Sequence, residues 1–164
     1  MLSKAMQDAI NSQINKELYS SYLYLAMSSH FAESNLGGFA SWMKVQSSEE
    51  CGHAMKFYGY LIERNAHVEL EAIEKPNAKF KSPVEVFKEV LAHEQKVTAS
   101  IHKLYDLAVK EKDYATEIML QWFVTEQLEE EKSAGDILEQ LKMVGDSPVS
   151  IIMMDRQLAA RANK

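Results

Sequence analysis

The sequence predicts an all-α fold, a bundle of four long helices followed by a short fifth one. Three observations predict it. Apolar residues recur along most of the chain at the three- and four-residue spacing of amphipathic helices. Only 3 prolines and 6 glycines interrupt the 164 residues, which favours long helices over a turn-rich β fold. Ser82-Pro83 and Ser147-Pro148 are typical helix starts, with serine as the N-cap and proline as the first helical residue.

The ends of the predicted helices follow from turn and capping residues. Asn35-Leu36-Gly37-Gly38 is typical of a tight turn, Asp113 suits an N-cap, and Gly145 suits a helix end. Each long helix would measure about 40 Å at a rise of about 1.5 Å per residue. The predicted helices, all within a single domain over residues 1–164, cover residues 5–34, 38–65, 83–110, 114–143 and 148–160.

The connections between these helices predict the topology. Short turns join the first helix to the second and the third to the fourth, so each pair forms an antiparallel hairpin. The segment 66–81 between the hairpins is longer. Its roughly 16 residues could span about 50 Å when extended, enough to run the length of the bundle. We therefore expect a long crossover, with the second and third helices parallel.

Composition and charge limit the possible partners. The net charge of −6 argues against a general nucleic-acid binder, which would concentrate lysine and arginine on one face. Polar residues break every apolar run well short of a membrane span. The single cysteine, Cys51, cannot form an intrachain disulfide, which agrees with a reducing compartment. We expect a cytoplasmic protein without nucleic-acid or membrane partners, and we assign no role to Cys51.

Each of the four long apolar stripes carries polar residues near its middle. Counted from the two short turns, these residues lie roughly 14–19 positions away, so antiparallel pairing places them at one height. The residues of this predicted layer are Glu17, Glu50, His53, Glu94, Gln127 and Glu130. An unpaired buried carboxylate costs several kcal/mol, and four together would repel one another.

Two divalent cations would offset the charge of four carboxylates. An oxygen-rich ligand set with one imidazole favours iron or manganese over metals that prefer thiolates. The i, i+3 spacing in Glu50-Cys51-Gly52-His53 places a carboxylate and an imidazole on one helix face, as in bundles that bind two metal ions. The alternative is a polar layer without metal in a purely helical scaffold.

Five segments of the chain together are typical of one protein family. They are Gln13-Ile14-Asn15-Lys16-Glu17, Ser21-Tyr22-Leu23-Tyr24-Leu25, Glu49-Glu50-Cys51-Gly52-His53-Ala54, His93-Glu94 and Gln121-Trp122-Phe123-Val124-Thr125-Glu126-Gln127. On these segments the sequence closely resembles the bacterial non-haem ferritins, and the resemblance covers essentially its full length. The resemblance implies a homo-oligomeric shell of twenty-four subunits around a ferric oxide mineral, with a ferroxidase centre in each subunit.

The resemblance also implies ligands for two iron ions per subunit. One ion would take Glu17, Glu50 and His53. The other would take Glu50, Glu94 and Glu130, with Gln127 nearby and Glu50 bridging. Tyr24 and Trp122 match a tyrosine and a tryptophan beside the centre. A possible third iron would share Glu130 and use three further residues, Glu49, Glu126 and Glu129.

Departures from neighbouring families refine this expectation. The fourth helix has Gln127-x-x-Glu130 instead of a second Glu-x-x-His motif, so the second iron should be held more weakly. Cys51 stands where bacterioferritins have the haem-binding methionine, so no haem is expected. A chain with one cysteine cannot build the Cys-x-x-Cys iron domain of rubrerythrins.

The expected function is oxidation of Fe(II) by O2 or hydrogen peroxide, followed by storage as ferric oxide. Two alternatives share the fold: a di-iron oxidase or peroxidase without storage, and a structural cage subunit without redox activity. We expect Ile151, Met154 and Leu158 to form an assembly contact on the last helix. The four remaining histidines are expected to be surface groups: His30, His67, His93 and His102.

Overall fold

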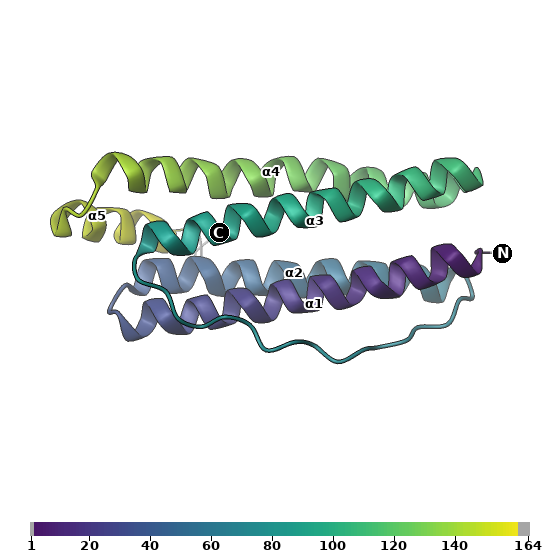
Figure 1. Ribbon diagram of the computed structural model, residues 1–164, viewed down its shortest axis with the longest axis horizontal. Coiled ribbons are helices and arrows are strands. Elements are labelled where there is room, and N and C mark those ends of the chain that lie inside the picture. The colour runs from purple at the N-terminus through teal and green to yellow at the C-terminus, as the bar shows by residue number, and fades with distance from the viewer. Residues whose placement is uncertain (1, 161–164) are drawn as a thin grey trace.

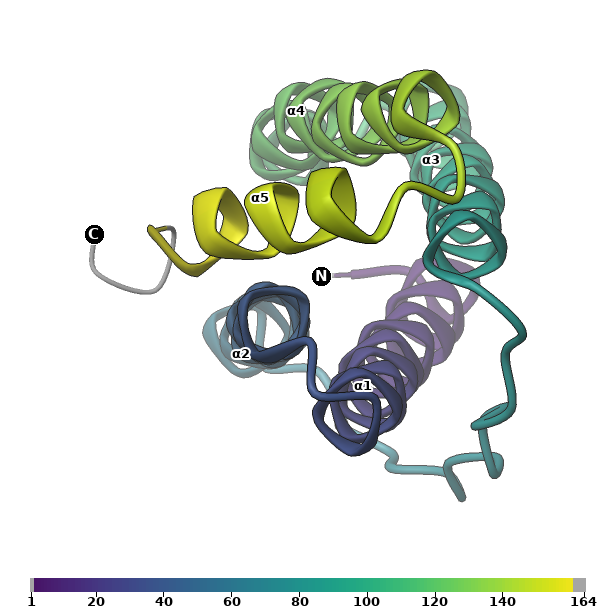
Figure 2. The same cartoon turned by 90° about the vertical axis from the view of Figure 1, so that its left-hand side faces the viewer.

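The computed structural model describes residues 2–160, and four long helices lie side by side in it (Figure 1). Seen end-on, they occupy the four corners of a bundle, and a short fifth helix crosses one end (Figure 2). The all-α prediction is confirmed, and the helix boundaries agree with the predicted ones to within two residues, with three of the five starts identical. The helices are α1 (Lys4–Glu33), α2 (Gly37–Glu63), α3 (Pro83–Glu111), α4 (Tyr114–Val144) and α5 (Pro148–Ala159).

Side-chain caps begin four of the five helices. In each case the capping oxygen accepts a hydrogen bond from the backbone N–H three residues further on, which satisfies one of the unpaired donors of the first turn. The capping residues are Ser3, Ser82, Asp113 and Ser147. The backbone takes a positive φ at the ends of the four long helices, at Asn35 (58°), Asn65 (53°), Lys112 (57°) and Gly145 (56°). These local signals are the ones that the sequence makes visible.

The start of α2 is capped from another helix. Leu36 provides no capping side chain, and the Asp155 carboxylate of α5 accepts hydrogen bonds from the backbone N–H groups of Gly38 (2.7 Å) and Phe39 (2.9 Å). A carboxylate is also favoured there by the helix dipole. A Cβ at Gly38 would lie 1.6 Å from the Asp155 carbonyl oxygen, so only glycine fits beneath α5.

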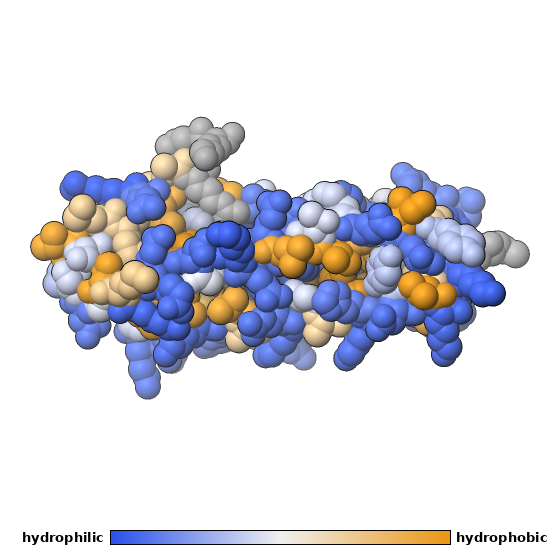
Figure 3. Space-filling model, turned by 90° about the horizontal axis from the view of Figure 1, so that it is seen from above, coloured by the Kyte–Doolittle hydropathy of each residue, from blue (hydrophilic) through white to orange (hydrophobic). Residues whose placement is uncertain are grey.

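The apolar face of α5 packs in part on its own chain, and its expected role as an assembly contact stays a prediction. Met154 is buried, and Ile151 and Leu158 pack on the apolar cluster at that end of the bundle. The reason is that α5 folds back across the helix ends (Figure 2). Val149 and Met153 point away and are 69% and 67% exposed. Figure 3 shows apolar side chains at this end, and further apolar patches along the rest of a face that is mostly hydrophilic.

The predicted crossover is confirmed. Residues 64–82 run along the bundle beside α1, so α2 and α3 point the same way (Figures 1 and 2). Polar side chains of α1 hold this segment by its backbone. Asn11 accepts from the N–H of Glu69 (2.9 Å) and donates to the carbonyl of His67 (3.0 Å). Asn15 donates to the carbonyl of Ala72 (3.1 Å).

A layer of polar side chains divides the core into two apolar clusters. On each long helix, residues on one side of the layer belong to the cluster near α5, for example Phe31 and Phe87, and those on the other side to the second cluster, for example Ile10 and Phe123. The buried side chains of the layer include Gln13, Glu17, Gln46, Glu50, His53, Glu94, Gln127 and Glu130. Within the described part of the chain, no helix is long and apolar enough to cross a membrane.

Candidate metal centre

Glu17, Glu50 and His53 meet in the buried layer. One potential ligand atom from each lies within 4.8 Å of the others, a spacing that a single ion can bridge. Glu17 and Glu50 are each 1% exposed, and His53 is 6% exposed. Glu17 comes from α1, and the i, i+3 spacing on α2 brings the Glu50 Oε2 to 3.4 Å from the His53 Nδ1. The structure thus gathers the three residues that were expected to bind the first ion.

One oxygen of Glu17 has no hydrogen-bond partner. Its Oε1 accepts from the Gln13 Nε2 at 2.8 Å, whereas its Oε2 is the one buried side-chain polar atom of the described residues without a partner. A buried acceptor left unpaired costs about 1–3 kcal/mol, and more when it is charged. Because a cation bound to this oxygen would remove that cost, the donor set fits a metal ion.

Gln13 belongs to the site, although it was not among the predicted residues. Its side-chain oxygen accepts from the Ser100 Oγ (2.6 Å), which in turn accepts from the Lys16 Nζ (2.6 Å). This chain fixes the orientation of the amide, so that its NH2 group must face Glu17. The available signal was the i, i+4 spacing to Glu17, but a glutamine in a helix is usually exposed.

Glu94 is held by two neutral donors. The Tyr24 hydroxyl donates to its Oε1, and the Gln127 Nε2 donates to its Oε2 at 3.1 Å. The structure thus places Tyr24 and Gln127 against this carboxylate, as expected for residues beside the centre. Glu94 does not reach the metal-sized groups found among residues 2–160, because both of its oxygens face these donors.

Glu130 joins a partner expected at the third ion rather than those expected at the second. Its ligand atom lies within 4.8 Å of those of His53 and Glu126, and the resemblance implies that Glu126 shares a third ion with it. No metal-sized group among the described residues joins it to Glu50 and Glu94. The Gln46 amide explains the arrangement, because its Nε2 donates to the Glu130 Oε2 (2.7 Å) and lies 3.3 Å from the Glu50 Oε1. Gln46 was not among the predicted site residues.

The residues expected for a third ion are only partly gathered. Glu126 is half-buried, and its Oε1 lies 4.0 Å from the His53 Nε2. Glu49 and Glu129 are exposed, and the metal-sized groups within residues 2–160 contain neither. The charge of Glu49 still reaches the layer, since it helps to raise the pKa of Glu130.

Burial and mutual repulsion raise the pKa values of the four glutamates in the layer. Burial is the largest cause that raises the pKa of Glu17 and Glu50, followed by the charges of neighbouring glutamates. Burial also raises the pKa of Glu94, and it raises that of Glu130 to about 7 with a contribution from the Glu94 charge. Without metal, the layer therefore retains protons near neutral pH, which an incoming cation would displace.

Aromatic rings fix the His53 imidazole. Trp122 and Phe123 of α4 lie edge-on to it, with ring centroids 5.3 and 6.1 Å away. The Lys56 ammonium lies 3.3 Å from the centre of the Trp122 ring, a cation–π contact. Trp122, expected beside the centre, therefore packs against the side chain that was predicted as a ligand, His53.

The expectation that His93 is a surface group is wrong. Its Nε2 lies 2.8 Å from the Ser20 Oγ, and its ring packs edge-on against Tyr24. Burial between α1 and α3 lowers its pKa to about 4, with a further contribution from Lys96. His93 is buried because α1 covers a face of α3 that the sequence periodicity of α3 predicts to be polar and exposed. His67 and His102 are exposed, whereas His30 is half-buried against Phe80.

Together, the bundle with its long crossover and the buried layer of four glutamates and one histidine are features of the helical bundles whose core carboxylates bind metal ions. A family comparison agrees with this class. The ferritin-like domain matches residues 7–144. The chain belongs to the ferritin family.

Individual relatives support the resemblance to bacterial non-haem ferritins. The chain is 42% identical to the bacterial non-heme ferritin of Bacteroides fragilis (strain 638R) over 161 residues, which cover 98% of this chain and 100% of the relative. It is 40% identical to that of Campylobacter jejuni over 158 residues, 96% of this chain and 95% of the relative. Among solved structures, an open pore ferritin from Archaeoglobus fulgidus superposes with a TM-score of 0.96 at 45% identity, covering 97% of this chain and 98% of that one.

Proposed function

We propose that this protein stores iron by oxidising Fe(II) to Fe(III) with O2 or hydrogen peroxide and retaining the product as ferric oxide. Membership of the ferritin family supports iron storage and ferroxidase chemistry in general. The observation that carries the proposal for this chain is the group of Glu17, Glu50 and His53 with an unpartnered buried oxygen. A buried anionic cluster of this kind favours cations strongly.

In the proposed reaction, Fe(II) is the substrate. Glu17, Glu50 and His53 bind the first ion, and Glu50 shares the second with Glu94 and Glu130. The carboxylate oxygens stabilise Fe(III) more than Fe(II), because the product carries the higher charge. Two adjacent Fe(II) ions supply two electrons, and with two protons these reduce O2 to hydrogen peroxide.

The second ion requires two side chains to change partners. Gln127 must release the Glu94 Oε2, and Gln46 must release Glu130, before these oxygens face a shared ion. The Tyr24 hydroxyl continues to donate its hydrogen bond to the Oε1 of Glu94. These rearrangements cost free energy, which supports weaker binding at this half of the centre. Product leaving it would pass a third site formed by Glu49, Glu126 and Glu129 with Glu130.

Aerobic addition of Fe(II) to the purified iron-free protein tests the proposal. We expect rapid oxidation at the centre, with iron retained in the protein fraction after gel filtration. Glu17→Gln should slow oxidation by at least about tenfold, because the variant loses a charged ligand worth more than about 1.4 kcal/mol. Glu33→Gln, an exposed change on the same helix, serves as the matched control.

The alternatives give different results in the same experiment. Rapid oxidation without retained iron identifies an oxidase or peroxidase, and retention without protein-catalysed oxidation identifies a structural cage. Absence of both refutes the proposal. We further propose a cytoplasmic shell of twenty-four identical subunits, supported by the family relationship and by the exposed apolar residues of α5. Size-exclusion chromatography with light scattering tests the subunit number.

A further inference from the structure

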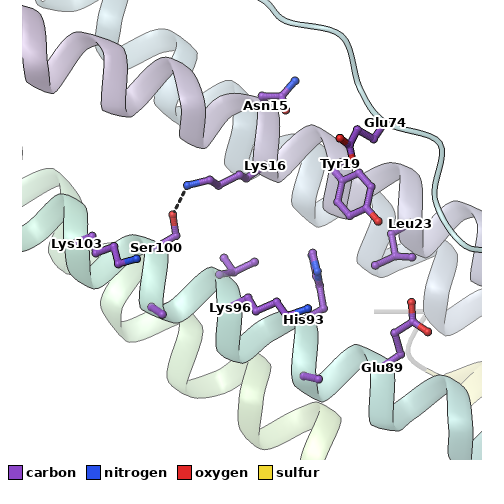
Figure 4. A pocket seen from close by; sticks show the side chains of 13 residues that line it. Asn15, Lys16, Tyr19, Leu23, Glu74, Glu89, His93, Lys96, Ser100 and Lys103 are labelled. Atoms are coloured by element: carbon purple, nitrogen blue, oxygen red, sulfur yellow. Dashed lines mark hydrogen bonds between the residues drawn. The ribbon is translucent and has the colours of Figure 1, made fainter.

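A cavity of about 670 Å³ lies between α1 and α3, beside the crossover. Its walls are unlike those of the metal centre, because they carry basic residues at one end and acidic residues at the other (Figure 4). Lys16, Ser100 and Lys103 form the basic end, whereas Glu74 and Glu89 lie beyond Tyr19 at the other. The volume lies in the range of about 300–1,000 Å³ typical of small-molecule sites.

The lysines of this cavity are not neutralised by the protein. Among residues 2–160, no ion pair includes Lys16, Lys96 or Lys103. This is notable in a chain with a net charge of −6, where carboxylates outnumber basic groups. Ammonium groups at one end of a cavity whose carboxylates lie at the other end favour an anionic occupant at the basic end.

One of these ammonium groups is held in position. The Ser100 hydroxyl donates its hydrogen bond to the buried Gln13, so the Ser100 oxygen accepts the hydrogen bond from Lys16. Lys16 is therefore oriented before any ligand arrives and keeps two N–H donors for it. A donor fixed in advance lowers the entropy cost of binding.

The rest of the cavity suits an organic group. Leu23 and Val97 are buried apolar residues of the lining, and the Tyr19 ring offers a flat surface at the middle of the wall. The volume far exceeds that of a single inorganic ion. The two lysines of the basic end match the double negative charge of a phosphate monoester, for which lysine is a common partner.

We propose that the cavity between α1 and α3 binds a phosphate-bearing small molecule, with the phosphate at Lys16 and Lys103 and the organic part along Tyr19, Leu23 and Val97. This site adjoins the metal centre through the hydrogen bonds from Lys16 to Ser100 and from Ser100 to Gln13, but it does not depend on the proposed ferroxidase function. A test on iron-free protein distinguishes the two. Free phosphate and a phosphate ester would both present a phosphate group to the two lysines, so the experiment tests each of them separately.

The test is calorimetric titration of the assembled, iron-free protein with inorganic phosphate, with phenyl phosphate and with uncharged benzyl alcohol. We expect phenyl phosphate to bind more tightly than inorganic phosphate, and benzyl alcohol not to bind. The substitutions Lys16→Met and Lys103→Met keep an aliphatic side chain but remove the charge. Each should weaken the binding of phenyl phosphate about tenfold, equivalent to about 1.4 kcal/mol. Lys44→Met, an exposed lysine on α2, should leave binding unchanged.

Each possible result bears on the proposal. Binding of neither phosphate by the assembled protein overturns it, and shows that neighbouring subunits or bulk water fill the cavity. Binding that Lys44→Met weakens as much as Lys16→Met also overturns it, because the anion would then sit in a diffuse surface potential. Equal affinity for inorganic phosphate and phenyl phosphate overturns the proposed contacts with an organic group and identifies a site for inorganic phosphate alone. Circular dichroism and light scattering on every variant verify that fold and assembly are unchanged.

Discussion

Replacing Glu130 by glutamine should stabilise the metal-free protein at alkaline pH. Burial, the Glu94 charge and the Glu49 charge raise the pKa of Glu130 from 4.5 to about 7 in the folded chain. A folded state that binds a proton more tightly than the unfolded state loses stability as pH rises. For Glu130 the contribution is fully present below about pH 4.5 and is lost as pH rises through about 7.

The size of the effect follows from the pKa difference. A difference of about 2.5 pKa units at about 1.4 kcal/mol each gives about 3 kcal/mol at pH 8. At pH 5 the same calculation gives less than about 1 kcal/mol. A neutral glutamine never carries this charge, and its side-chain oxygen can still accept the hydrogen bond from Gln46. For a chain of this size, about 3 kcal/mol corresponds to a rise in the unfolding temperature of about 6–12 °C.

The assay is thermal unfolding of the metal-free protein at pH 5 and pH 8, at one protein concentration. Glu129→Gln is the control, since this neighbouring glutamate on α4 is exposed. Fe(II) should stabilise the wild type more than Glu130→Gln, because the variant lacks one ligand of the second ion. An equal unfolding temperature for wild type and Glu130→Gln at pH 8 would refute the reasoning, because it would mean that the carboxylate is not penalised by burial.

Three further changes test the centre and the fold. Gln13→Leu removes the donor to Glu17 and should weaken Co(II) binding about tenfold, measured by absorption titration, because a hydrogen bond to a charged group is worth about 1.5–3 kcal/mol. Tyr24→Phe removes the hydroxyl donor of the layer and should lower the unfolding temperature of the metal-free protein by a few degrees, equivalent to about 1–2 kcal/mol. Gly38→Ala should detach α5, because its Cβ would meet the Asp155 carbonyl at 1.6 Å, and should expose α5 to limited proteolysis.

Matched controls separate these effects from general damage. Gln95→Leu alters an exposed glutamine of α3 and should leave Co(II) binding unchanged. Gly37→Ala adds a Cβ with nothing within 4 Å and should be neutral or stabilising by about 0.5–1 kcal/mol. If Gly38→Ala resists proteolysis as well as Gly37→Ala, the close packing of α5 on α2 is not a constraint on the fold.

The helices and the position of the polar layer could be predicted from the sequence. Helix caps such as Ser82 and Asp113 act on backbone groups three residues further on, so the local sequence is enough to predict them. The layer was visible because each glutamate interrupts an apolar stripe, and because distance from a tight turn sets height in an antiparallel hairpin. The gathering of Glu17, Glu50 and His53 agrees with that reasoning.

Only the tertiary structure decided how the polar groups pair. Ser100 contacts Gln13 across 87 positions of sequence, Gln46 contacts Glu130 across 84, and Asp155 caps Gly38 across 117. None of these pairs has a local signature, because hydrogen-bond geometry depends on fractions of an ångström in how helices pack. The periodicity of one helix likewise does not show which neighbour covers it. The sequence by itself therefore determined which glutamates and which histidine enter the polar layer. The packing of the helices determined that Gln13 and Gln46 join them, and which oxygen of Glu17 is left without a partner.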